Sequence, residues 1–193
     1  MESVKQEFTT TNITVLPGEI VQLIGTTPDS CIIFRQDVPT KPSSLVVYPE
    51  KKVSQTRAFP TFHSDTIAVL LERWLADVPI RSFQKIIAKM GLEGAAPMLV
   101  QSADTDVCFR LNMLKAVLEG KQVIQVVSPW KVSDVTDFML AIQEFAVDQA
   151  EQRSEDAPAF VVYDGDESTG ISIVANDILV VEAGQVKRRL VLL

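Results

Sequence analysis

The stretch of sequence that decides the fold is PGEIVQLIGTTPDS, residues 17–30. Pro17-Gly18 is a turn signal, and the apolar run from Ile20 to Ile24 is typical of a central strand covered on both faces. A phosphate-binding loop after such a strand needs a glycine-rich arc, a lysine, and a Ser or Thr at the start of the next helix. Here the arc at 26–29 reads Thr-Thr-Pro-Asp, with no Gly-Lys pair, and Asp29 would repel a phosphate. The stretch therefore predicts a buried strand whose phosphate-binding chemistry is missing.

Composition places the chain among ordinary globular proteins. Its 193 residues are 47% hydrophobic and 22% charged, with a net charge of -7, and that size is enough for one domain with a sizeable core. The negative charge argues against a general nucleic-acid binder, because phosphate binding needs a concentrated basic face. The polar N-terminus predicts no signal peptide, and no apolar run approaches the roughly 20 residues that span a bilayer. We expect one domain over 1–193, in the cytoplasm or, in a eukaryote, the nucleus.

The cysteine, histidine and serine residues of the sequence do not form a recognisable catalytic pattern. Cys31 and Cys108 are far apart in apolar settings, so we expect free buried thiols in a reducing compartment. The single histidine, His63, stands at a predicted helix entrance and is expected to be structural. Ser30, Ser128 and His63 do not have the spacing of a hydrolase set, and no Gly-x-Ser-x-Gly elbow is present.

Segments with strand and helix patterns alternate along the chain. Residues 1–12 are polar and are expected at the surface, as a flexible segment or an edge strand. The segment 31–34 is either a strand hairpinned to the first strand or the remnant of a helix, and its β-branched content favours the strand. Further strands or extended segments are predicted at 45–48, 98–100, 123–127, 160–163, 171–174, 178–181 and 186–193. Helices are predicted from a cap at Ser64 or Asp65, from a cap at Ser82 to Gly91, from Asp104–Asp106 to Gly120, and from a cap at Ser133 to about 149.

This alternation predicts an α/β fold with a mostly parallel central sheet flanked by helices. The glycine-containing turn at 182–185, between two apolar strands, predicts a C-terminal antiparallel β-hairpin.

The order of parts resembles the core of the RecA/KaiC-like ATPases, within the P-loop NTPase group. The likeness rests on the Pro-Gly-Glu turn before an apolar strand that ends at Gly25, on a second strand that ends at Glu50, and on the tail 175–192. Members of that group often close with an Ala-Asp-x-apolar strand, a turn and a basic-apolar last strand. ATP-binding cassette proteins share the Pro-Gly-Glu turn and a similar hairpin, but their Ser-Gly-Gly-Gln signature is absent here. The resemblance implies a RecA-like fold.

The catalytic parts of that group are not retained. The phosphate-loop lysine and hydroxyl are missing, and the strand expected to end in a magnesium-coordinating aspartate ends in Val127-Ser128-Pro129. Glu50 occupies the place of the RecA-like catalytic glutamate, but without a phosphate cradle it has no γ-phosphate to act on. We therefore expect no enzymatic activity, no catalytic, cofactor-binding or metal-ligating residue, and no cofactor.

Five residues are candidates for an interface: Trp130, Lys131, Lys187, Arg188 and Arg189. Trp130 and Lys131 follow a central strand, where open α/β sheets place their ligands, although core packing is an equal alternative for Trp130. The basic run 187–189 is suited to DNA or to an acidic partner, although basic residues also protect edge strands from pairing.

The leading hypothesis is a non-catalytic RecA-like pseudo-ATPase, a structural or regulatory subunit that assembles with a paralogous RecA-like subunit or with itself. One alternative is a DNA-associated accessory factor in recombination or repair, resting on Lys187–Arg189 and on fold analogy. Another is an unrecognised α/β enzyme with Glu50, or the acidic loop formed by Asp164, Asp166 and Glu167, as its acid–base or metal site. The alternative reading of that loop is a solvated turn.

Overall fold

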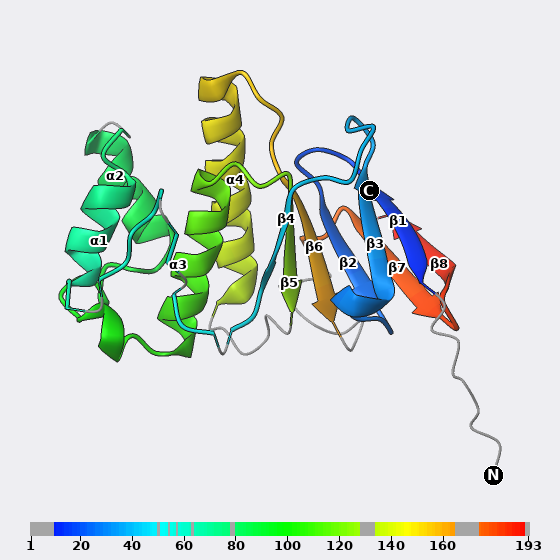
Figure 1. Cartoon of the computed structure of the whole chain (residues 1–193), viewed down its shortest axis with the longest axis horizontal. Helices are drawn as coiled ribbons and strands as arrows, with labels where there is room; N and C mark the ends of the chain where they lie inside the picture. The colour runs from blue at the N-terminus through cyan, green and yellow to red at the C-terminus, as the bar shows by residue number, and fades with distance from the viewer. Residues whose placement is uncertain are drawn as a thin grey trace, which may run out of the picture.

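The computed structural model describes residues 10–49, 51–53, 55–56, 58–62, 64–77, 80–127, 134–164 and 174–191 (Figure 1). Its elements in chain order are β1 (Thr11–Val15), β2 (Ile20–Ile24), the 3-10 turn η1 (Pro28–Ser30), β3 (Cys31–Arg35), β4 (Ser44–Val47), α1 (Ile67–Trp74), α2 (Ile80–Lys89), the 3-10 turn η2 (Val100–Ser102), α3 (Thr105–Leu118), β5 (Val123–Val127), α4 (Val135–Arg153), β6 (Ala159–Asp164), β7 (Asp177–Glu182) and β8 (Gln185–Val191).

Six strands form the main sheet in the order β4-β5-β6-β2-β7-β8. The pairs from β4 to β7 are parallel, and β7 pairs with β8 in antiparallel register around a two-residue turn. Strand β2 lies inside the sheet between β6 and β7, and all five of its residues are buried. These pairings confirm the α/β fold with a mostly parallel sheet and a C-terminal antiparallel hairpin.

The two faces of the sheet are covered by different kinds of layer. Helices cover one face, where Ile20 and Ile24 of β2 join the larger hydrophobic core. The other face carries a second, two-stranded sheet of β1 and β3, whose Ile13, Val15 and Ile33 pack with Val21 and Leu23 of β2. Figure 1 shows β1 and β3 lying over β2 and β7. Successive residues of a strand face opposite sides, so β2 contributes to both cores.

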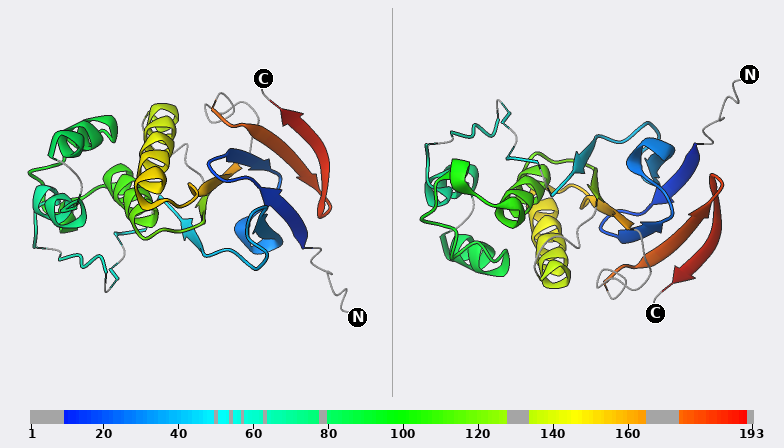
Figure 2. Two further views of the ribbon diagram at one scale, coloured as in Figure 1. Left: turned by 90° about the horizontal axis from the view of Figure 1, so that it is seen from above. Right: turned by 90° about the horizontal axis from the view of Figure 1, so that it is seen from below.

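The helices form two tiers (Figure 2). Helices α3 and α4 lie next to the sheet, and α1 and α2 lie beyond them. Every residue of α3 from Val107 to Leu118 is buried, as expected of a helix enclosed on all sides. Its buried Arg110 is held by Asp106, 2.7 Å from Nε, and by the carbonyl of Met90, 2.9 Å from Nη1. Asp104 caps this helix as predicted, because its carboxylate accepts from the Val107 amide.

Two predicted helix caps are wrong. Helix α1 is capped by Thr66, whose hydroxyl accepts from the Val69 amide at 3.3 Å, rather than by Ser64 or Asp65. Asp65 instead pairs with Arg73 of the same helix. Helix α2 begins at Ile80, so Ser82 lies inside it. The cap predicted at Ser133 lies outside the described residues, and the N-cap position of α4 is Asp134.

The expected pairing of the segment 31–34 is also wrong. It is a strand, as its β-branched content favoured, but it is not hairpinned to β2. It runs parallel to β1, with Cys31 opposite Thr11 and Arg35 opposite Val15. The predicted extended segment 98–100 makes one isolated bridge, between Leu99 and Thr66, and then becomes η2. The predicted strand at 171–174 lies largely outside the described residues.

The end of β2 gives a test of this architecture. Gly25 has φ +79°, and a Cβ at this position would lie 2.5 Å from the Val181 carbonyl oxygen of β7. Gly25→Ala is therefore expected to lower the free energy of unfolding by about 2 kcal/mol, through backbone strain and the clash with β7. Urea denaturation measures the change. Gly94→Ala is the matched control, because its Cβ would meet no atom within 4 Å. Equal stability of the two variants would contradict the close packing of β2 on β7.

Candidate functional site

The loop at 25–30 occupies the position where a nucleotide site is expected. It follows β2 at the carboxyl end of the parallel strands, and the chain places β6 and β7 on opposite sides of β2. In open α/β sheets, ligands bind outside the carboxyl ends of the strands at such a switch point. The geometry of this loop therefore decides whether a phosphate can be held.

The hydroxyls of the loop are engaged with each other and with a neighbouring thiol. Thr26 Oγ1 lies 3.2 Å from Cys31 Sγ, and Thr27 Oγ1 lies 3.2 Å from Ser30 Oγ. The Ser30 amide donates to the Thr27 carbonyl at 3.0 Å. Asp29 stands in the first turn of η1. The loop is closed on itself by these short-range contacts.

The element that follows the loop differs from that of a phosphate-binding motif. A P-loop is a strand, a glycine-rich loop and a helix, and the helix N-terminus supplies amide groups and a positive dipole end to the phosphate. Here β2 is followed by three residues of 3-10 helix and then directly by β3. Because Cys31–Arg35 is committed to pairing with β1, these residues form no helix whose N-terminus faces the loop.

Buried polar side chains near the carboxyl ends of the strands pair with each other. Gln22 Nε2 of β2 donates to Asp164 Oδ2 of β6 at 3.1 Å, on the helix-covered face. Tyr163 donates its hydroxyl proton to Gln125 Oε1 of β5 at 2.6 Å, on the opposite face. Burial raises the pKa of Tyr163, so its hydroxyl stays protonated. The sequence analysis placed Asp164 in an acidic loop and did not foresee these cross-strand pairs, although a polar residue inside an apolar strand is a signal for them.

Nothing in the described part of the chain gathers a metal centre, since no group of three or more His, Cys, Asp or Glu side chains comes together there. The other two members of the acidic loop, Asp166 and Glu167, lie outside that part of the chain, as do Glu50, His63 and Ser128. Burial raises the pKa of the Cys31 and Cys108 thiols. Both cysteines are free, Cys108 buried and Cys31 half-buried.

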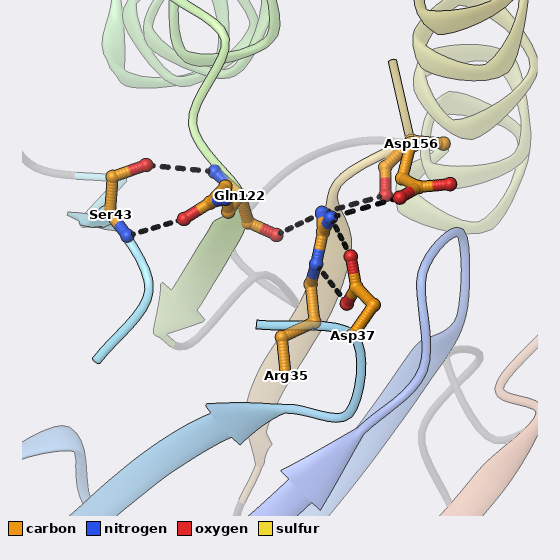
Figure 3. A network of polar contacts seen from close by, with 6 residues as sticks. Arg35, Asp37, Ser43, Gln122 and Asp156 are labelled. Carbon is orange, nitrogen blue, oxygen red and sulfur yellow. Dashed lines mark hydrogen bonds and ion pairs between the residues drawn. The ribbon is translucent and has the colours of Figure 1, made fainter. Parts of the chain in front are cut away.

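Arg35 forms a polar cluster at the opposite end of the sheet, where the central strands begin (Figure 3). It is the last residue of β3, and its side chain is only 4% exposed. Its guanidinium donates to both carboxylate oxygens of Asp37, and Nη1 donates to the carbonyls of Gln122 and Ala157 at 3.4 and 3.2 Å. Because Gln122 precedes β5 and Ala157 precedes β6, Arg35 fixes the end of β3 to the amino ends of two central strands.

The Arg35 cluster was missed by the sequence analysis. Its local signal is an arginine that ends a strand with an aspartate two residues later, and that pattern is common in surface turns. Asp156 adds a longer ion pair to the cluster, at 3.7 Å. Gln122 is itself held by Ser43, through hydrogen bonds of its amide with Ser43 Oγ at 3.3 Å and of its Oε1 with the Ser43 amide at 2.9 Å. These contacts hold the strands together.

The five predicted interface residues are divided by the structure. Trp130 and Lys131 lie outside the described residues. Lys187, Arg188 and Arg189 belong to β8, an edge strand of the main sheet, where Arg188 is opposite Val180 and Arg189 opposite Leu179. The exposed Lys187 donates from Nζ to Gln185 Oε1 at 2.9 Å. A role for this run in binding DNA or a partner stays a prediction.

Comparison with known proteins identifies the fold. No protein-family model and no curated protein matches the chain. A solved structure of an ATP binding subunit of an ABC transporter matches with a TM-score of 0.50 and 12% identity, over 91% of this chain and 80% of that one. CbiO1 from Clostridium perfringens, part of the ABC transporter complex cbiONQ, gives 0.49 and 11% over 90% and 77%. An inward-facing putative metal-chelate type ABC transporter gives 0.48 and 12% over 89% and 71%.

At such identities the likeness concerns the fold alone, and the first of these matches shows a P-loop NTPase-like fold. ATP-binding cassette proteins were the less similar of the two groups considered from the sequence. The predicted likeness to the P-loop NTPase fold, which both groups share, is confirmed. No helix among the described residues is long and apolar enough to cross a membrane.

The Arg35 cluster yields a prediction about stability and pH. Arg35→Met is expected to lower the free energy of unfolding at pH 7 by about 2 kcal/mol or more, because it leaves two strand-end carbonyls and Asp37 without their buried cation. Arg73→Met is the matched control. It breaks the half-exposed pair with Asp65 and should cost less than about 1 kcal/mol. Urea denaturation measures both values.

The same cluster sets the pH dependence of that difference. The hydrogen bond from Arg35 holds the pKa of Asp37 below its ordinary value. The stabilisation is therefore fully present above about pH 4 and is lost as the pH falls through the lowered pKa. The stability gap between wild type and Arg35→Met should narrow below that pH. If the difference in unfolding free energy between wild type and Arg35→Met stayed constant down to the pH of acid unfolding, the stabilising role of the Arg35–Asp37 pair would be contradicted.

Proposed function

We propose that this chain is a non-catalytic protein of P-loop NTPase-like fold that works by assembling with another protein chain. The observation that carries the proposal is the replacement of the phosphate-loop helix by β3, which pairs with β1. Loss of a lysine alone would leave the helix N-terminus and its amides. Loss of the helix removes the cradle itself, and the catalysis of this fold depends on positioning and charge neutralisation at that cradle.

The other polar groups at the carboxyl ends of the strands also support the interpretation that the phosphate site is inactive. The hydroxyls of Thr26 and Thr27 are engaged with Cys31 and Ser30. Strand β5 ends at the half-buried Val127, at the position where an acidic metal ligand is expected. Asp164 accepts a hydrogen bond from Gln22 within the sheet.

The outer face of the β1–β3 sheet is the surface through which we propose that the assembly forms. Leu16, Ile32 and Phe34 point away from the core there, with exposed fractions of 41, 36 and 37%. Parallel strands are normally covered on both faces, and an exposed cluster of large apolar side chains marks an interaction site. The matching solved structure is by its title a subunit of a transporter, which supports an assembly role. The partner we propose is a second copy or a related subunit of P-loop fold.

The inactive phosphate site is tested by calorimetric titration with ATP and Mg²⁺. We expect no saturable binding up to about 1 mM. Asp29→Lys is the informative variant, because it removes the repelling carboxylate and adds a cation to the loop. It is also expected not to bind, since β3 still replaces the helix. Micromolar binding by the wild type would overturn the inactive reading, and binding by Asp29→Lys would show that only the charge had been lost.

The association surface is tested by comparing two double variants. Ile32→Thr with Phe34→Thr removes the apolar groups from β3 while keeping its β propensity. Leu140→Thr with Val147→Thr removes two exposed apolar groups from α4, with exposed fractions of 46 and 37%. Analytical ultracentrifugation of the chain alone and with a co-expressed P-loop subunit should show a complex that only the first pair weakens. A monomer under all conditions with no co-purifying partner, or equal loss in both pairs, would argue against the proposal.

A further inference from the structure

A second candidate site lies at the far end of the helix layer from the loop after β2. A cleft of about 430 Å³ opens between the C-terminal turns of α1, α3 and α4. Helices α3 and α4 end just before β5 and β6, so the cleft lies toward the amino ends of the strands. Its volume is within the range of small-molecule sites. The side chains that carry the argument are those of Phe59, Trp74, Asp77, Leu118, Gln149 and Arg153.

Gln149 of α4 is the buried polar group of this cleft. The residue is 7% exposed, and its amide has no hydrogen-bond partner in the described part of the chain. Its amide atoms are not fully enclosed, so they can form hydrogen bonds with a molecule in the cleft. Gln149 also lines two smaller hollows, of about 80 and 20 Å³. The Gln149 amide is therefore available to a ligand in the cleft.

Two opposite charges line the cleft without neutralising each other. Arg153 donates from Nη1 to the Leu118 carbonyl at 3.3 Å, and neither Arg153 nor Asp77 forms an ion pair within the described ranges. Arg73 also lines the cleft, but its charge is compensated by Asp65 at 2.8 Å. Both residues are exposed, and the cleft offers one cation and one anion that a ligand can reach. Three helix C-terminal ends add partial negative charge.

An apolar wall completes the cleft. Phe59 and Trp74 pack edge to face, with ring centroids 6.1 Å apart and an interplanar angle of 90°. The Trp74 indole nitrogen donates to the Pro60 carbonyl at 3.4 Å, which fixes the ring. Leu118 extends this wall from the end of α3.

We propose that the cleft binds a small apolar α-amino acid. Its carboxylate is held by the Arg153 guanidinium and the Gln149 amide, which are hydrogen-bond donors. Its ammonium group is held by Asp77. Its side chain packs on Trp74, Phe59 and Leu118. A ligand that carries both charges can pair with the cation, the anion and the Gln149 amide together.

The binding test uses Trp74 as its reporter. Trp74 and Trp130 are the two tryptophans of the chain, so Trp130→Phe leaves Trp74 as the only one. This protein is titrated with L-leucine, L-methionine and L-phenylalanine up to about 10 mM. We expect a saturable change in Trp74 emission with at least one of them. For the amino acid that binds, analogues that lack the amino group or the carboxyl group should bind about tenfold more weakly or less.

Variants locate the binding to the cleft. In the same background, Arg153→Gln, Asp77→Asn and Gln149→Leu are each expected to weaken binding by about tenfold or more. Lys41→Gln and Glu93→Gln make the same charge changes at exposed positions outside the cleft and should leave binding unchanged. The proposal is overturned if none of the three amino acids binds, if the single-charge analogues bind as tightly, or if the cleft variants bind as well as the controls.

Stability gives a separate readout for Gln149. Gln149→Leu should unfold at the same urea concentration as wild type or a higher one, because it removes an amide without a partner. Gln143→Leu is the contrast. It loses the 2.6 Å hydrogen bond from Gln143 Nε2 to the Gly18 carbonyl and should unfold at a lower concentration. Destabilisation of Gln149→Leu as large as that of Gln143→Leu would assign the amide a structural role and contradict the proposal.

Discussion

The parallel pairing of β3 with β1 is the interaction on which the rest of this structure depends. Five consecutive residue pairs hold the two strands in register. Their inward side chains, Ile13, Val15 and Ile33, bury the sheet face that the helices leave open. A two-stranded sheet is marginally stable alone, so this layer persists through its packing on β2, β5, β6 and β7 and through Arg35. The residues that could have formed a phosphate-binding helix are used to build it.

The carboxyl and amino ends of the strands therefore carry different structures. At the carboxyl end, the loop after β2 is closed by its own hydroxyls and passes directly into β3. At the amino end, Arg35 joins three segments into one buried cluster. Beyond that end, the helix C-terminal turns leave a cleft with unused polar groups. The fold is P-loop NTPase-like, while the cleft lies at the opposite end of the strands from the loop after β2.

Local sequence patterns predicted the parts of this structure that depend on neighbouring residues. The run Ile20–Ile24, the hairpin turn at 182–185 and the missing lysine are all visible within a few residues. The partner of β3 was not predictable, because two parallel strands whose paired residues lie twenty positions apart have no turn signal that sets their register. The cap of α1 was misassigned because Ser64, Asp65 and Thr66 stand side by side at its start, and each is a good capping residue. The roles of Arg35 and Gln149 depend on residues that are distant in the sequence, so no local pattern predicts them.

Amide hydrogen exchange of β3, with and without ATP and Mg²⁺, tests the central claim most directly. If β3 is a permanent strand, the ladder amides of 32–35 exchange slowly, at rates close to those of β2, and ATP with Mg²⁺ leaves them unchanged. Fast exchange of these amides, together with new protection spreading through 27–38 when ATP is added, would mean that the segment refolds around a phosphate. That result would contradict the account.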